Sequence, residues 1–95
     1  MKSKRLLIQV TEEHIRKGRP SESERCPVAL AMREAGLPIK YAAAGLGEFI
    51  FRGGLRSGLR IPMPPRVQDW AWDFDNRCNV KPFSFTLTVP QEVRS

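Results

Sequence analysis

The sequence predicts a small α+β domain, with a mostly antiparallel sheet and helices packed on one of its faces. A helix is indicated from Pro65 onward, because five apolar positions share an arc of roughly 100° when the residues are spaced at helical intervals. These positions are Val67, Trp70, Ala71, Phe74 and Cys78. A half-buried strand follows, in which apolar residues alternate with serine and threonine; the apolar set is Phe83, Phe85, Leu87 and Val89. A helix laid on one face of a sheet buries both apolar sets.

The 95 residues predict a single domain that spans residues 1–95. No stretch approaches the roughly 18 apolar residues of a membrane span, and the cluster at Leu6 is too short for a secretory signal. We therefore expect a cytoplasmic protein without membrane contact. In that reducing compartment Cys26 and Cys78 are expected to be free, with Cys78 buried on the apolar arc of its helix.

The first third of the chain predicts a strand and two helices. Residues 4–10 alternate in polarity as a strand does, and Thr11 then suits the N-cap of a short helix over 12–17 that ends at Gly18. The polar run 19–25 is expected to be a loop. A second helix begins at Pro27, with Cys26 at or near its N-cap, and Gly36 closes it.

The middle of the chain predicts a meander of strands over 39–44, 48–52 and 58–61, joined by a turn at 45–47 and a glycine-rich tip. The element order is therefore β-α-α-β-β-β-α-β. The side chains expected in the core are Ile8, Val10, Val28, Met32, Phe49, Phe51, Val67, Trp70, Phe74, Phe83, Phe85 and Leu87.

Basic side chains concentrate in the middle of a chain whose formal net charge is +6. Arginine outnumbers lysine, which favours phosphate or carboxylate partners. We expect Arg52, Arg56 and Arg60 to be exposed together on a hairpin that contacts a partner, with Lys40 and Arg66 adding to the basic surface. The alternative is a solvated hairpin tip whose arginines keep a strand edge soluble.

Trp72 is predicted to point away from Trp70 and Phe74, into the polar side of the helix. A tryptophan is costly to leave in water and is common at the centre of binding interfaces, so Trp72 is a candidate partner-binding anchor. The alternative is that a neighbouring loop covers the ring, with an arginine stacked on it.

The sequence favours no catalytic residue, no metal site and no cofactor site. His14, Cys26 and Cys78 lack the spacing of a zinc site, and no phosphate-binding loop or nucleophile elbow occurs. One enzymatic alternative stays open: a hydrolase or nuclease that uses His14 with Cys26, whose thiol pKa a helix N-terminus would lower.

Two blocks of the sequence resemble a group of small uncharacterised proteins from bacteriophages and prophages. The first block is VTEEHI at 10–15 followed by CPVALA at 26–31; the second is VQDW at 67–70, Phe74-Asp75 and VKPFSF at 80–85. Together they cover about half of the chain. The resemblance implies an origin in a phage accessory locus and implies no catalytic activity.

These observations predict a non-enzymatic phage-type accessory protein that binds a host or phage protein or nucleoprotein complex. One specific form of this hypothesis is an inhibitor of a host defence system, similar in role to an anti-CRISPR protein. The alternative is a protein that binds nucleic acid directly through the arginine-rich hairpin.

Overall fold

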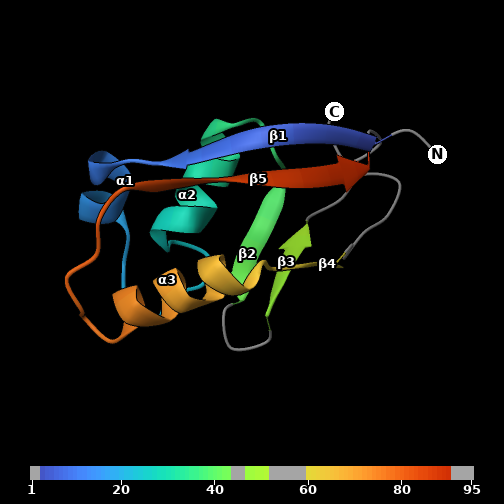
Figure 1. The fold of residues 1–95 in the computed structure, drawn as a ribbon. Helices are drawn as coiled ribbons and strands as arrows, with labels where there is room; N and C mark the ends of the chain where they lie inside the picture. The colour runs from blue at the N-terminus through green and yellow to red at the C-terminus, as the bar shows by residue number, and fades with distance from the viewer. Residues whose placement is uncertain (1–2, 44–46, 52–59, 91–95) are drawn as a thin grey trace.

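The computed structural model describes residues 3–43, 47–51 and 60–90, and it confirms the predicted α+β class and element order (Figure 1). The elements are β1 (Ser3–Val10), α1 (Glu12–Lys17), α2 (Pro27–Glu34), β2 (Ile39–Ala43), β3 (Glu48–Phe51), β4 (Arg60–Pro62), α3 (Pro65–Asp75) and β5 (Phe83–Pro90). None of the helices in this part of the chain is long and apolar enough to cross a membrane.

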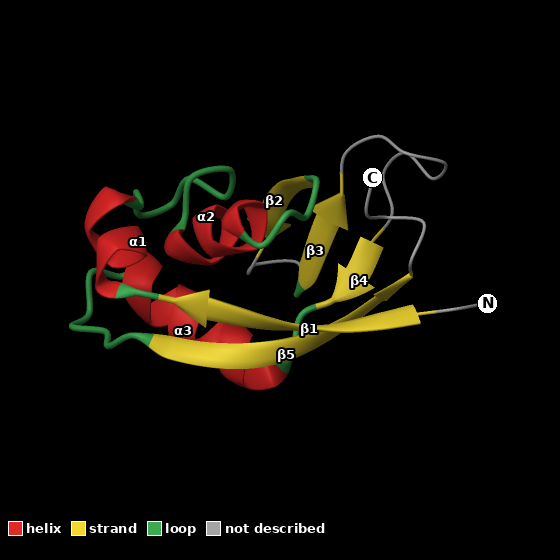
Figure 2. Cartoon of the chain, turned by 90° about the horizontal axis from the view of Figure 1, so that it is seen from above, coloured by secondary structure: helices red, strands yellow, loops and turns green. Residues whose placement is uncertain are grey.

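The strands form two antiparallel sheets. β1 pairs with β5 along its whole length, so that Ser3 lies opposite Pro90 and Val10 lies opposite Phe83. The other sheet has the order β2-β3-β4, which is the predicted meander. Figure 2 shows the long β1–β5 pair crossing in front of α3, with the second sheet beside it. The predicted glycine-rich tip lies outside the described residues.

The β1–β5 pair has one buried face and one exposed face. Ile8 and Val10 are buried on β1, while Arg5, Leu7 and Gln9 are exposed. On β5 the alternation is the same: Phe85, Leu87 and Val89 are buried, whereas Ser84, Thr86 and Thr88 are exposed. The period of two in both sequences therefore indicated the correct inner face.

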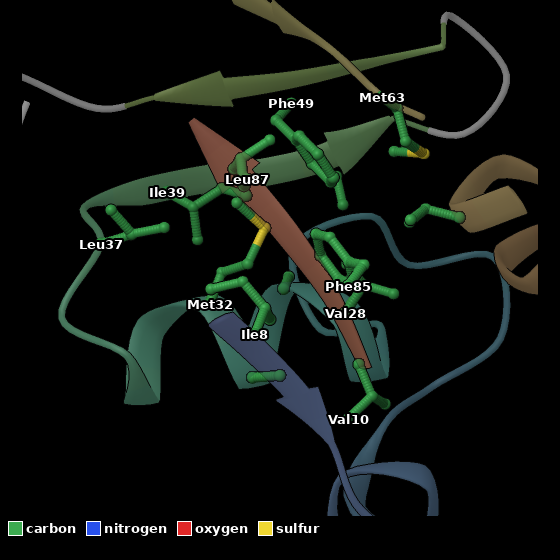
Figure 3. Packing of buried hydrophobic residues seen from close by; sticks show 14 of the residues in the cluster. Ile8, Val10, Val28, Met32, Leu37, Ile39, Phe49, Met63, Phe85 and Leu87 are labelled. Atoms are coloured by element: carbon green, nitrogen blue, oxygen red, sulfur yellow. The ribbon is translucent and has the colours of Figure 1, made fainter. Parts of the chain in front are cut away.

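The core gathers side chains from the β1–β5 pair, α2 and the second sheet. Figure 3 shows Ile8, Met32, Phe49 and Phe85 pointing toward one another from four different elements. The predicted core side chains within this cluster are Ile8, Val10, Val28, Met32, Phe49, Phe51, Val67, Phe85 and Leu87. Of the other predicted core side chains, Trp70 and Phe83 are half-buried against the cluster, and Phe74 is buried.

The ends of α1 and α2 carry the predicted signals. Thr11 caps α1, since its hydroxyl accepts the N–H of His14 while the His14 ring accepts the N–H of Thr11. A Cβ on Gly18 would lie 2.6 Å from the Pro27 ring, so this glycine permits close packing of the two helices. At the end of α2, Gly36 has a φ of 89°, and the N–H of Leu37 donates to the Met32 carbonyl, which forms a Schellman motif.

Candidate functional site

The inner face of α3 is anchored by aromatic packing. Val67, Ala71 and Phe74 are buried. The Trp70 ring stacks on Phe83 with centroids 4.8 Å apart, and its Nε1–H donates to the Lys81 carbonyl at 2.8 Å. These contacts join the helix to β5 and to the segment before it, so the orientation of α3 is fixed.

Arg66 takes part in the same anchoring. Its guanidinium donates to the Ser84 carbonyl at 2.8 Å and lies 6.0 Å above the centre of the Phe83 ring. This side chain was predicted to contribute to a partner-binding surface. In the structure it contacts β5 and so helps to hold α3 in place, a structural contact that sequence analysis did not predict.

The outer face of α3 exposes Trp72, as the helical wheel predicts. The residue keeps 62% of its surface exposed, and no loop among the described residues buries the ring. Asp69 and Asp73 are exposed beside it, and within the described part of the chain neither carboxylate has a hydrogen bond or an ion pair. The Asp75 carboxylate differs, because it accepts the N–H of Ser21 at 2.9 Å.

The helix ends at Asp75, and the backbone then turns sharply. Arg77 has a φ of 61°, and the N–H groups of Arg77 and Cys78 donate to the carbonyls of Phe74 and Asp73. This Schellman motif ends the helix before Cys78. The prediction that Cys78 is buried is therefore wrong: the pattern assumed that the helix continues to Cys78, whereas the cysteine lies beyond the helix and is exposed.

The other predicted basic contacts are distributed over the second sheet. Lys40 and Arg60 are both exposed, and they lie on the two edge strands β2 and β4, separated by β3. Arg60 forms a long ion pair with Glu48, with Nη1 3.7 Å from Oε1. Arg52 and Arg56 lie outside the described residues. Arg66 is on α3 and not on this sheet.

The predicted His14 and Cys26 pair has structural contacts. His14 is buried, its Nδ1 accepts the Thr11 N–H, and its Nε2 lies 2.9 Å from Oε2 of Glu34. A neutral ring that accepts at Nδ1 carries its proton at Nε2, so it donates to Glu34. Both ring nitrogens therefore link α1 to its N-cap and to α2.

Cys26 is the N-cap of α2, and its sulfur accepts the N–H of Ala29 at 3.4 Å. Burial raises the pKa of the Cys26 thiol, and this effect outweighs the lowering by the backbone N–H groups of Ala29 and Val28. The helix N-terminus thus lowers the thiol pKa as expected, but the net shift is upward, so the prediction of a lowered pKa is wrong. A buried thiol with a raised pKa is a poor nucleophile.

Within residues 3–43, 47–51 and 60–90, no group of three or more histidine, cysteine or acidic side chains is placed to hold a metal ion. In comparisons with family models, curated proteins and solved structures, none matches this chain.

Proposed function

We propose that the protein acts by binding another macromolecule through the outer face of α3, without a catalytic role. The exposure of Trp72 is the observation that carries this proposal. Tryptophan is enriched among the few residues that dominate binding energies, and the anchored inner face holds Trp72 on a rigid element. A preorganised side chain loses little conformational entropy on binding.

The biological setting belongs to the same proposal. The protein is a phage-type accessory protein that acts in the host cytoplasm and binds a host or phage protein or nucleoprotein complex. The sequence resemblance supports this setting, and so do the two free cysteines, one of them exposed, which suit a reducing compartment. Inhibition of a host defence complex is its specific form. A small rigid surface suits that role because it can occupy a site that the complex needs.

The test compares Trp72→Ala with the unmodified protein in pull-downs from a bacterial lysate, with and without nuclease treatment. We expect the variant to stay folded and to bind the captured partner at least about thirtyfold more weakly, which corresponds to about 2 kcal/mol. Leu7→Ala is the matched control, since Leu7 is 59% exposed on a different element, β1, and its loss should leave binding unchanged. Equal capture by the Trp72→Ala variant would refute the proposal.

Direct binding of nucleic acid is the second candidate, supported by the net charge of +6 and by the exposure of Lys40 and Arg60. If Arg52, Arg56 and Arg60 neutralise three phosphates of double-stranded DNA, they alone contribute about −3 to the slope of log affinity against log salt. The triple alanine variant should lose that contribution. An unchanged affinity at low salt would remove these arginines from the mechanism.

A further inference from the structure

The charges of α3 oppose the rules that stabilise an isolated helix. Asp69 and Asp73 are four residues apart, so they are neighbours on the helix surface, where like charges repel each other. Neither carboxylate is neutralised by a cation in the described part of the chain. Within the described residues no ion pair or hydrogen bond therefore offsets this repulsion.

The arrangement along the helix axis is also unfavourable. A helix dipole favours acidic residues in the first turn and basic residues in the last turn. In α3 the first turn contains no acidic residue and instead holds Arg66, while the last turn contains no basic residue and holds Asp73 and Asp75. Local rules that a sequence breaks without compensation tend to mark functional surfaces.

The exposed ring of Trp72 lies within this acidic surface. Asp69 precedes it by three residues and is its neighbour on the helix, and Asp73 follows it directly. The face of a tryptophan ring attracts a cation, and an arginine stacked on such a ring can also donate to a nearby carboxylate. A phosphate, by contrast, is repelled by two free carboxylates.

We infer that the outer face of α3 binds a cationic segment of a protein partner, with an arginine over the Trp72 ring and its guanidinium hydrogen-bonded to Asp69 or Asp73. The inference rests on the proposed function and adds the chemistry of the partner. Binding relieves the repulsion between Asp69 and Asp73, so charges that oppose the free helix favour the complex.

The experiment uses a short synthetic peptide of alternating arginine and glycine as the probe. Control probes are the same peptide with glutamate in place of arginine, and oligo(dT). Titrations are followed by the NMR signals of the two indole N–H groups, at about 0.15 M salt, where screening limits the effect of the overall positive charge. We expect the arginine peptide to shift the Trp72 signal, whereas the Trp70 signal, whose N–H donates to the Lys81 carbonyl, stays in place.

The double variant Asp69→Asn with Asp73→Asn should bind the arginine peptide at least about tenfold more weakly. Its matched control is Glu22→Gln with Glu24→Gln, which removes the same charge from two exposed loop residues and should change the affinity less than about twofold. The aspartate variant should also melt at the same or a higher temperature, because a like-charge pair is removed. A merely structural role for these aspartates predicts a lower melting temperature.

Three results would overturn the inference: no shift of the Trp72 signal with the arginine peptide, an equal or larger shift with the glutamate peptide or oligo(dT), or an affinity that is unaffected by the two asparagine substitutions. The lysate pull-down separates this failure from failure of the proposed function. If Trp72→Ala loses the partner and the aspartate variant keeps it, the proposed function stands and the cationic partner does not. If Trp72→Ala also keeps the partner, the proposed function itself fails.

Discussion

α1 and α3 are stabilised in opposite ways. α1 has Glu12 and Glu13 in its first turn, Lys17 in its last turn, and a capping box at Thr11. The Lys17 ammonium lies 2.9 Å from the Glu13 carboxylate, and this contact lowers the pKa of that carboxyl group. Each of these features satisfies the polar groups or the dipole of a short helix.

α3 has none of these end features. Its N-cap is Pro64, which makes no side-chain hydrogen bond, and its charges run against the dipole. The buried contacts of Val67, Ala71 and Phe74 hold it instead. Since inner-face packing supplies its stability, residues on the outer face that do not stabilise the helix can be tolerated there and can serve binding. The following variants test this difference, in order of decreasing effect.

Phe74→Ala tests whether packing holds α3. Phe74 is buried and stacks on Trp70 with centroids 5.9 Å apart. We expect a loss of about 3–5 kcal/mol in the free energy of unfolding, measured by urea denaturation. Trp72→Ala is the control on the outer face and should change stability by less than about 0.5 kcal/mol. Similar losses for both variants would show that α3 is covered on both sides.

Thr11→Ala tests the polar stabilisation of α1. The substitution leaves the His14 N–H without its acceptor and should cost about 1–2 kcal/mol of unfolding free energy. Thr11→Ser keeps the hydroxyl, so it should restore most of the loss. An alanine variant as stable as the original would show that the cap contributes nothing.

Arg77→Gly addresses the turn after α3. Arg77 adopts a left-handed conformation that a residue with a Cβ occupies at a cost, whereas the equivalent position after α2 is Gly36. We expect Arg77→Gly to raise the melting temperature by the equivalent of about 0.5–1 kcal/mol. The reverse exchange, Gly36→Ala, should lower it. If both substitutions destabilise the protein, then the contacts of the Arg77 side chain stabilise the fold by more free energy than its left-handed backbone conformation costs.

The two cysteines lie at different places relative to a helix: Cys26 is at the start of α2, and Cys78 follows the end of α3. A thiol reagent should label exposed Cys78 rapidly and buried Cys26 only on unfolding, which mass spectrometry of timed samples can measure. The folded pKa of Cys26 is raised, so its contribution to stability is complete below the unfolded pKa of about 8.5 and is lost as the pH rises further. Cys26→Ser keeps a capping side chain without ionising in this range, so it should reduce that alkaline loss. Rapid labelling of both thiols in the native protein would contradict the burial.

Local signals predicted most of the fold. The residues that start and stop the first two helices, Thr11, Gly18 and Pro27, act on the backbone within a few residues of themselves, so their effect can be seen in the sequence. The period of two in β1 and β5 reports burial directly. The direction of Trp72, away from Trp70 and Phe74, was predictable from its angular position on the helix, whereas its exposure was not, since a loop could have covered the ring.

Contacts between distant segments were not predictable in this way. The division of the strands into two sheets depends on pairing between β1 and β5, and no local pattern specifies a partner. From the sequence Arg66 is expected to be one more surface cation, but in the structure it donates a hydrogen bond to the Ser84 carbonyl. The unfavourable pair of Asp69 and Asp73 was visible from its spacing of four, but its meaning depends on where the helix ends and on the lack of an ion pair to either carboxylate within the described residues.

The pairing of β1 with β5 also affects the order of folding. A hairpin can form as soon as its second strand is synthesised, but β1 must wait until all the other elements have left the ribosome. Until then its apolar side chains Ile8 and Val10 have no strand beside them, and its backbone offers an edge on which other chains can assemble. We therefore expect refolding to be limited by closure of this long-range pair, and fragments that end before Phe83 to aggregate rather than to form a smaller stable domain.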